Sequence, residues 1–155
     1  MRDYTIHIPT YIDAQEIQDL LYPGYFDESV YNTLDYDETA TLNYILNWIG
    51  EHTFIARDNG GKVVGVMAFY FANTFYKQKE CDLVMLYIHP DFRGSGLSRD
   101  FVQILDGVCR EIGNVGVAYT TSGSGMEGNN DALYKNLFKK FGFEVLGTEL
   151  IKVFK

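Results

Sequence analysis

The sequence has little cysteine and no long apolar run, and these two absences exclude several classes of protein. Cys81 and Cys109 are its only cysteines, too few for a disulfide framework or a cysteine-rich metal site, so we expect no bound metal. Both lie in apolar periodic segments, which indicates buried thiols and a reducing, cytoplasmic setting. No segment reaches the roughly 20 apolar residues that span a bilayer, and the stretch MRDYTIHIPTYIDAQ lacks the apolar centre of a signal peptide. We therefore expect no contact with a membrane.

Positive charge is also scarce. The 13 Lys and Arg residues are outnumbered by 21 Asp and Glu residues, which gives a formal net charge of -8. Such a surface repels phosphate backbones, so we expect no nucleic-acid partner. It suits a cationic acceptor, although solubility alone explains the excess of acid equally well. With 46% apolar residues in a chain of 155, the composition predicts one folded domain over residues 1–155.

Apolar periodicity predicts strands and helices that alternate along this domain. An Asp58-Asn59-Gly60-Gly61 run predicts a tight hairpin turn, because Asn and Gly tolerate the positive φ that such turns need. Helical spacing is found at residues 13–21, 37–48, 97–112 and 131–141. Strands are predicted at residues 4–8, in the two runs that flank the hairpin turn, and at residues 81–89, 115–121, 143–147 and 149–154.

The first predicted helix carries both a start signal and a stop signal. Asp13 is expected to be its N-cap, with Glu16 completing a capping box. Pro23 and Gly24 are expected to end it. The following segment, up to residue 37, is aromatic and acidic and is predicted to be irregular.

A glycine-rich turn, Arg93-Gly94-Ser95-Gly96, separates an apolar strand from a helix, which is the arrangement of an anion site. First-turn amides of a helix have no partner within the helix, and the helix dipole adds partial positive charge there. Glycine lets an oxygen-rich group approach the backbone, and Arg93 adds a charge-assisted bond to a phosphate. The chain has no P-loop pattern, and Arg99 breaks the dinucleotide fingerprint G-x-G-x-x-G. We expect a pyrophosphate cradle at residues 93–98.

Two motifs resemble the signatures of the Gcn5-related N-acetyltransferases, the GNAT superfamily. The first, LYIHPDFRGSGLSRDFVQIL, is similar to the acyl-CoA signature of an apolar strand, a proline and a [Q/R]-x-x-G-x-[G/A] turn, except that Ser98 stands where glycine or alanine is usual. The second is NNDALYKNLFKKFGF at residues 129–143. The resemblance covers nearly the whole chain and implies an α/β (α+β) GNAT fold. It implies a mixed, mostly antiparallel central sheet of about seven strands, flanked by helices and splayed between the fourth and fifth strands.

The resemblance also implies how a cofactor, acetyl-CoA, is held. Backbone groups of Leu86 and Ile88 are expected to pair with the pantetheine arm as an added strand would. Asn130 is expected to contact pantetheine, and Tyr134 is expected to lie near the thioester sulfur. The amides expected to bind the pyrophosphate are those of Arg93, Gly94, Ser95, Gly96, Leu97 and Ser98.

The implied reaction is direct acetyl transfer from acetyl-CoA to a primary amine of a protein, a polyamine or a small molecule. Because the amine must lose a proton, Asp82 is the predicted base, directly or through a water, with Glu80 left open. In an unbroken strand Asp82 points to the same face as Leu86 and Ile88, and an amide near Ile88 is expected to polarise the thioester carbonyl. Tyr134 is the predicted acid that protonates the leaving thiolate. A solvated strand end and a core tyrosine are the alternatives for Asp82 and Tyr134.

Two segments are expected to select the acceptor, the aromatic and acidic residues 22–37 and the glycine-rich loop 122–129. An ordinary surface loop explains either segment equally well. Two other functions stay open at this stage. One is a non-catalytic acyl-CoA binding or sensing module on the same fold, and the other is an interaction protein in which Gly94 to Gly96 form only a turn. The sequence also leaves a homodimer open.

Overall fold

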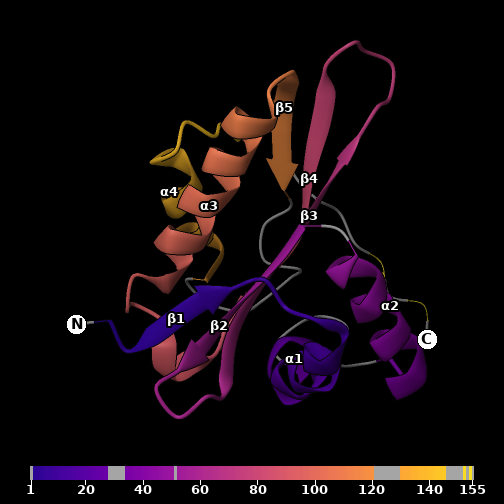
Figure 1. Ribbon diagram of the computed structural model, residues 1–155, viewed down its shortest axis with the longest axis vertical. Coiled ribbons are helices and arrows are strands. Elements are labelled where there is room, and N and C mark those ends of the chain that lie inside the picture. Colours follow the sequence, from indigo (N-terminus) through magenta and orange to yellow (C-terminus); the bar gives the residue numbers. More distant parts are fainter. Residues whose placement is uncertain are drawn as a thin grey trace.

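A mixed five-stranded sheet organises the part of the chain that the computed structural model describes, which is residues 2–27, 34–50, 52–120, 130–145, 152 and 154. The strands lie across the sheet in the order in which they occur along the chain (Figure 1). The first four pair antiparallel, and the fifth runs parallel to the fourth. They are β1 (Tyr4–His7), β2 (His52–Asp58), β3 (Val63–Ala72), β4 (Lys79–Ile88) and β5 (Val115–Thr120).

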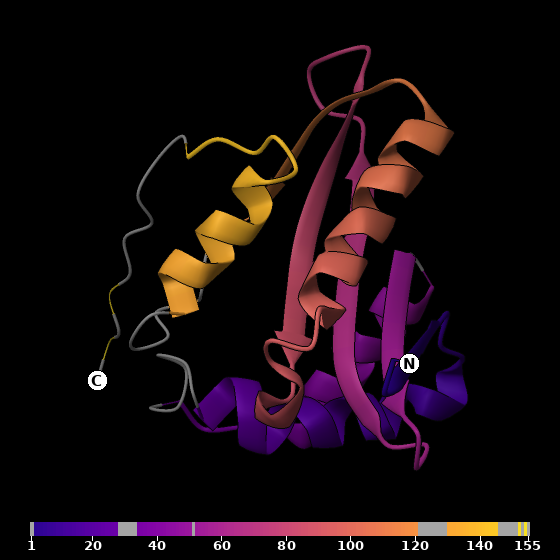
Figure 2. The same cartoon turned by 90° about the vertical axis from the view of Figure 1, so that its left-hand side faces the viewer.

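Helices cover both faces of this sheet (Figures 1 and 2). They are α1 (Ala14–Leu21), α2 (Glu38–Ile49), α3 (Leu97–Ile112) and α4 (Asn130–Lys139). One apolar core lies under α3 and α4 and includes Phe69, Phe101 and Phe138. The other lies under α1 and α2 and includes Ile17 and Ile45. None of the helices in the described ranges is long and apolar enough to span a bilayer.

Most of the predicted elements are confirmed, but the strand number is not. The hairpin turn forms as expected, with a φ of 88° at Gly61 and with the Asp58 carboxylate accepting bonds from the Gly60 and Lys62 amides. The described residues form five strands instead of about seven. The segments expected to be the last two strands lie mostly outside the described residues, and residues 143–145 form no strand. The splay between β4 and β5 stays a prediction.

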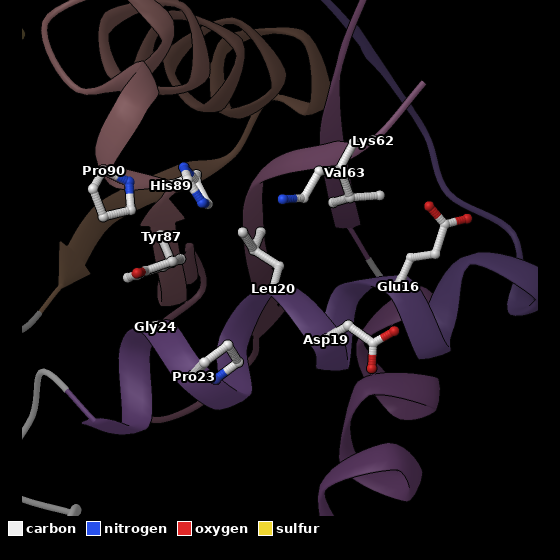
Figure 3. A pocket seen from close by; sticks show the side chains of 10 residues that line it. All are labelled: Glu16, Asp19, Leu20, Pro23, Gly24, Lys62, Val63, Tyr87, His89 and Pro90. Carbon is white, nitrogen blue, oxygen red and sulfur yellow. The ribbon is translucent and has the colours of Figure 1, made fainter. Parts of the chain in front are cut away.

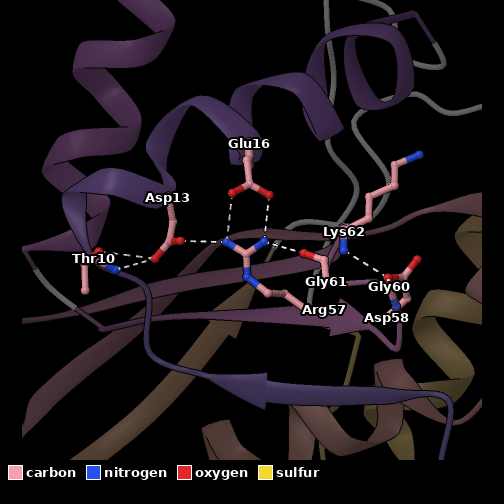
Figure 4. Close-up of polar contacts among 8 residues, drawn as sticks. All are labelled: Thr10, Asp13, Glu16, Arg57, Asp58, Gly60, Gly61 and Lys62. Carbon is pink, nitrogen blue, oxygen red and sulfur yellow. Dashed lines mark hydrogen bonds and ion pairs between the residues drawn. The ribbon is translucent and has the colours of Figure 1, made fainter.

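The start of α1 differs from the predicted capping box. Asp13 accepts a bond from the Thr10 amide at 2.7 Å, and this closes a box around the preceding 3-10 turn (Tyr11–Asp13) instead of around α1. Asp13 also binds Arg57 at 2.6 Å, and Glu16 binds the same guanidinium at 2.6 and 3.0 Å (Figure 4). Burial alone would raise the pKa of Asp13, but the Thr10 amide and the Arg57 guanidinium lower it. Arg57 also donates to the Gly61 carbonyl, so it fastens α1 to the β2–β3 hairpin.

Pro23 and Gly24 do not end the helical path, contrary to expectation. The chain leaves α1 at Leu21 and continues as a π-helical turn (Tyr22–Phe26). Proline is tolerated in the first turn of a helix because no amide is needed there. Gly24 packs directly on β4, since a Cβ at this position would overlap the hydroxyl of Tyr87. The π-helical turn thereby brings Tyr25 to Tyr87, with ring centroids 6.1 Å apart.

A β-bulge divides β4 at Val84. Ala68 pairs with Met85 and Phe69 pairs with Leu83, so Val84 is the extra residue between the two pairs. Leu83 packs in the core under α3, whereas Met85 packs in the core under α1 and α2. The alternation of side chains along β4 is therefore shifted by one residue at the bulge.

This bulge overturns the expectation that Asp82, Leu86 and Ile88 share one face of the sheet. Leu86 and Ile88 pack in the core under α3. Cys81 and Leu83, on either side of Asp82, belong to that same core. Because neighbours along a strand point to opposite faces, Asp82 points to the other face, which is the one that α2 covers in part.

Candidate active site

A cleft of about 510 Å³ runs along the C-terminal half of β4, from Leu83, the last residue that pairs with β5. In Figure 2 this strand is seen between α3 and α4. The strand lines the cleft from Leu83 to Ile88, and the turn before α3 lines it with Arg93, Gly94 and Gly96. The other residues that line it are Tyr25, Ser98, Arg99, Thr120, Leu133, Tyr134, Leu137 and Lys140. This cleft therefore includes most of the predicted cofactor-binding residues.

Three amides of the predicted cradle are open toward the cleft. Gly94, Gly96 and Ser98 all line it, and their amides donate no hydrogen bond within the described part of the chain. Gly94 and Gly96 have φ values of 84° and 94°, a region that side chains other than glycine rarely enter. Ser98 lies in the first turn of α3, whose amides have no partner within the helix. Three open donors at alternate residues of a helix N-terminus suit an anion.

The other three predicted amides are used within the turn itself. Arg93 donates its amide to the Pro90 carbonyl at 3.1 Å, and Ser95 donates its amide to the Phe92 carbonyl at 3.3 Å. The Leu97 amide donates to the Ser95 hydroxyl at 3.4 Å, and the Leu97 side chain is fully buried. Ser95 and Leu97 do not line the cleft. Their part is to hold the turn in a shape that leaves the other three amides open.

The cleft gathers positive charge in a chain that is acidic overall. Arg93, Arg99 and Lys140 line it, and no Asp or Glu is among its described lining residues. Arg93 Nε donates to the carbonyl oxygen of Ile88 at 3.2 Å, and its guanidinium lies 5.6 Å from the ring centroid of Tyr87. Low-dielectric walls around charges of one sign focus their field. A ligand with several negative charges therefore suits this cleft.

Strand β1 anchors the helix that carries the open amides. The Tyr4 hydroxyl donates to Asp100 Oδ2 at 2.6 Å, and Arg2 Nη1 lies 2.8 Å from the same oxygen. Asp100 is buried in the first turn of α3, and its amide donates to the Gly96 carbonyl at 3.0 Å. Burial, and then the bond to Asp100 and its charge, raise the pKa of Tyr4 to about 12. The glycine turn is thus fixed to a buried network.

The edge of β4 that faces the cleft carries the backbone groups predicted to bind pantetheine. The His89 amide donates to the Val64 carbonyl at 2.8 Å, so His89 points its backbone groups toward β3. Backbone groups alternate between the two edges of a strand. Those of Leu86 and Ile88 therefore point to the opposite edge, where β5 pairs only as far as Leu83.

Tyr134 reaches the cleft from α4. Its hydroxyl lies 2.6 Å from Thr120 Oγ1, which in turn donates to the Leu83 carbonyl at 3.4 Å. Its ring packs on Phe138 with centroids 4.6 Å apart. Burial raises the pKa of Tyr134 to about 12, although the bond to Thr120 opposes the rise. The phenol therefore keeps its proton at neutral pH, next to the point where β4 and β5 stop pairing.

Some predicted site segments cannot be placed. Asn130 begins α4, but its side chain lies outside the described residues, as does the loop 122–129. Of residues 22–37, the structure describes all but 28–33, and it brings Tyr25 into the cleft. Sequence patterns alone do not single out Arg99, Thr120 or Lys140. The one available signal was that Arg99 and Lys140 are basic residues within the two motifs.

A second cavity, of about 370 Å³, lies where α1 approaches the end of β4 (Figure 3). Its charged side chains have both signs, with Glu16 and Asp19 from α1 and Lys62 from the β2–β3 hairpin. His89 also lines it, and its Nδ1 accepts a bond from the Asp91 amide at 3.3 Å. This mixture favours no single class of ligand, so the first cleft is the candidate active site.

Comparison with known families identifies the chain. A model of the acetyltransferase (GNAT) family matches residues 14–143. The chain belongs to this family. It is an acyl-CoA-dependent N-acetyltransferase, with acetyl-CoA as the acetyl donor, as the two sequence motifs predicted. A search of curated proteins finds no match.

Solved structures with the same fold agree with this family. An acetyltransferase from Trypanosoma brucei superposes with a TM-score of 0.72 at 15% identity, over 98% of this GNAT chain and 100% of that one. A predicted acetyltransferase from Clostridium acetobutylicum, solved with acetyl-CoA, has a TM-score of 0.71 at 16% identity, with 97% and 96% covered. Glucosamine-6-phosphate N-acetyltransferase from Arabidopsis thaliana has a TM-score of 0.69 at 14% identity, with 98% and 99% covered.

Proposed function

We propose that this GNAT chain acetylates a primary amine that is cationic in solution, by direct attack of its deprotonated form on the acetyl donor. The observation that carries the proposal is the cleft along β4, where three open amides and three cationic side chains meet and where the described lining residues include no carboxylate. Coenzyme A has a diphosphate and a further phosphate, so these donors and charges fit its anionic end. The edge of β4 beyond Leu83, with which no strand of the described residues pairs, fits its amide-containing arm.

Each cofactor-binding residue has a separate task in this proposal. The open amides of Gly94, Gly96 and Ser98 bind the diphosphate. Backbone groups of Leu86 and Ile88 hold the arm that leads from it. The predicted contact of Asn130 with the arm is kept as part of the proposal.

Bound acetyl-CoA supplies an acetyl thioester that an unprotonated amine attacks. The task of Tyr134 is to give its proton to the sulfur that leaves. A phenol whose pKa is about 12 is protonated throughout the neutral range, so the proton is always present. Thr120, in contact with the phenol at 2.6 Å, orients it.

Asp82 is the proposed base, directly or through a water. The bulge at Val84 turns its carboxylate away from Leu86 and Ile88, to the face opposite the cofactor. An amine that approaches from that face would meet Asp82 before it reaches the cleft. Glu80 lies two residues earlier on the same strand, so it is the alternative base.

Two observations support the proposed class of acceptor. Solved neighbours include enzymes named for glucosamine-6-phosphate, for an aminoglycoside and for a ribosomal-protein alanine, and each of these carries an amine. The net charge of -8 favours an amine that is cationic in solution.

The test is release of free thiol from acetyl-CoA in the presence of monoamines, diamines, amino sugars and basic peptides. We expect release above the amine-free rate with at least one cationic amine, together with formation of the acetylated amine by mass spectrometry. Thiol release that no amine in the panel accelerates, at saturating acetyl-CoA, would contradict the proposal.

A matched pair of variants tests the cleft itself. Arg99→Met removes a charge that lines the cleft, whereas Arg110→Met removes an exposed arginine of the same helix that pairs with Asp106. Since a hydrogen bond to a charged group contributes about 1.5–3 kcal/mol, Arg99→Met should weaken coenzyme A binding by roughly tenfold or more in calorimetry. Arg110→Met should leave it unchanged. Equal affinities of the two variants for coenzyme A would show that its phosphates do not bind in this cleft.

A further inference from the structure

A cavity with three aromatic walls lies on the face of the sheet opposite the cofactor cleft. Its volume is about 410 Å³, within the range of small-molecule sites. Tyr44 and Trp48 of α2 form two walls, with ring centroids 5.3 Å apart, and Tyr70 of β3 forms the third. The rest of the lining is Asn47, Ala68, Phe69, Phe71 and Val84. We call this the aromatic cavity.

A carboxylate lies next to Tyr70, one wall of the aromatic cavity. The strand register places Asp82 between Tyr70 on β3 and Tyr119 on β5, so the three lie side by side across the sheet. A hydrogen bond to Asp82, and then its negative charge, raise the pKa of Tyr70 to about 12. Tyr70 is 38% exposed and Tyr119 is 45% exposed, so the row is open to solvent.

These surroundings favour a positively charged group. The faces of aromatic rings carry partial negative charge and attract a cation, most strongly at tryptophan. Asp82 adds a full negative charge beside Tyr70, and no Lys or Arg is among the described lining residues. Purely apolar walls would suit an uncharged chain, but aromatic walls with a carboxylate beside one of them suit an ammonium group.

The aromatic cavity adjoins the cofactor cleft at one residue. Val84, the bulged residue of β4, lines both. It follows Leu83, whose pairing with Thr120 is the last between β4 and β5. Tyr134 contacts Thr120 from the other face of the sheet. A ligand held in the aromatic cavity therefore lies next to the place where the proposed chemistry occurs.

We infer that the aromatic cavity holds a second ammonium group of the acceptor, so that the acceptor is an aliphatic diamine or polyamine. This inference rests on the proposed function, because the other amine of the same molecule is the one that receives the acetyl group. The charged group stays between Tyr44, Trp48 and Tyr70 while the reactive amine extends past Val84 toward the cleft. An amine of equal length that carries a single charge follows the same path but lacks the second ammonium group that the aromatic cavity holds.

Equilibrium binding tests the cavity without any catalysis. Trp48 is the only tryptophan of the chain, so its fluorescence reports on the aromatic cavity alone. The probe is choline, a permanent cation whose nitrogen cannot be acetylated, and its control is the neutral isostere 3,3-dimethylbutan-1-ol. We expect saturable quenching of Trp48 by choline and none by the alcohol. Equal responses to the two probes, or none to either, would overturn the inference.

Two tyrosine variants give the matched comparison. Tyr44→Leu removes one wall of the aromatic cavity, and Tyr76→Leu makes the same change at an exposed tyrosine in the β3–β4 connection. Tyr44→Leu should weaken choline binding by roughly tenfold, since a cation–π contact contributes on the order of that factor. It should raise KM for 1,4-diaminobutane by a similar factor and leave KM for butylamine and the affinity for coenzyme A unchanged. Tyr76→Leu should change none of these.

The readouts separate failure of this inference from failure of the proposed function. In one outcome, the enzyme acetylates butylamine and 1,4-diaminobutane with equal KM and does not bind choline. This outcome would show that the aromatic cavity is not an acceptor site and would leave the acetyltransferase proposal intact. Choline binding that Tyr44→Leu weakens, without transfer to any amine, would support a cation site and contradict the proposed function. In a further outcome, sedimentation shows a dimer that Tyr44→Leu dissociates, and choline does not bind. This outcome would show that a second copy of the chain covers this face and would overturn the inference.

Discussion

Burial and one hydrogen bond determine what the Tyr134 hydroxyl can contribute. It is held at 2.6 Å from Thr120 Oγ1 and stays protonated because its pKa is raised to about 12. Tyr134→Phe keeps the ring that packs on Phe138 and removes only the proton donor. Since general acid catalysis contributes about 10²–10⁴-fold, we expect kcat to fall by roughly 100-fold or more, with little change in the affinity for coenzyme A. Steady-state kinetics and calorimetry measure the two quantities separately.

The control for this variant is Tyr76→Phe, which removes an exposed hydroxyl outside the cleft. It should leave kcat unchanged. The pH dependence gives a further check, because a group with a pKa of about 12 does not titrate between pH 7 and 10. Wild-type kcat should therefore show no loss in that range from ionisation of Tyr134. Equal kcat for Tyr134→Phe and wild type would show that another group protonates the thiolate.

Single residues also show what the sequence could and could not predict about the site. Tyr134 and Gly94 were predictable because each belongs to a local motif. Arg99 and Lys140 were not, because a basic residue in a helical turn resembles any surface residue until the fold brings the two to one cleft. The face of Asp82 was predicted wrongly, since a bulge is set by how β3 and β4 pair and not by the local alternation of apolar residues.

The turn before α3 depends on glycine at an identifiable position. Gly96 is the N-cap of α3 and has a φ of 94°. An added Cβ would meet only ordinary contacts, so Gly96→Ala destabilises the fold because alanine rarely adopts this positive φ. We expect a loss of about 1–2 kcal/mol in the free energy of unfolding. The open amides of Gly94 and Ser98 should shift with the turn, so the affinity for coenzyme A should fall as well. Urea unfolding and calorimetry test both effects.

Gly107→Ala is the matched control on the same helix. Gly107 lies in the middle of α3, does not have a positive φ, and has open space where a Cβ would be. Alanine there should raise the free energy of unfolding by about 0.5–1 kcal/mol, because it restricts the unfolded chain and favours the helix. Coenzyme A affinity should stay the same. If Gly96→Ala behaved like Gly107→Ala in both measurements, the cradle would not depend on the shape of this turn.

Elements with strong local signals were the most predictable. The bounds of α3 agree with the prediction because the glycine turn marks its start and Gly113 follows its end. The end of α1 was less clear from sequence, because packing of Gly24 on Tyr87 maintains a π-helical turn through a Pro-Gly pair that usually stops a helix. The start of α1 also depends on a residue that is distant in the sequence, because Asp13 binds Arg57 of β2. Long-range contacts of this kind leave no periodic signal in the chain.

On the scale of the whole molecule, the uneven distribution of charge matters more than the total. A net charge of -8 is combined with a cleft lined by three cations, and on the other face the carboxylate of Asp82 lies beside Tyr70, one wall of the aromatic cavity. In the proposed function, an anionic donor and a cationic acceptor approach opposite faces of β4 and meet at its bulge. The composition led to the expectation of a cationic acceptor, which stays a proposal, whereas the separation of the two charges on opposite faces is visible only in the fold. The homodimer stays a prediction.

The network of Tyr4, Asp100 and Arg2 links the sheet to the cofactor helix, and its removal should affect the stability of the whole fold. Tyr4→Phe leaves the buried Asp100 without its 2.6 Å partner, so we expect a loss of about 1–3 kcal/mol in the free energy of unfolding near pH 8. Tyr11→Phe, at a tyrosine that is 66% exposed, is the control and should cost nothing measurable.

The loss caused by Tyr4→Phe should shrink as the pH rises. The pKa of Tyr4 is about 12 in the folded chain and about 10 in the unfolded chain, so the unfolded chain releases this proton first. The stability that the Tyr4 proton contributes is therefore complete below about pH 10 and is lost as the pH rises through about 12. Urea unfolding, followed by Trp48 fluorescence at pH 8, 10 and 11.5, should give a wild-type curve that falls more steeply than that of Tyr4→Phe. Parallel curves would mean that the Tyr4 hydroxyl is not held by Asp100, and that β1 does not fix the first turn of the helix that binds the cofactor.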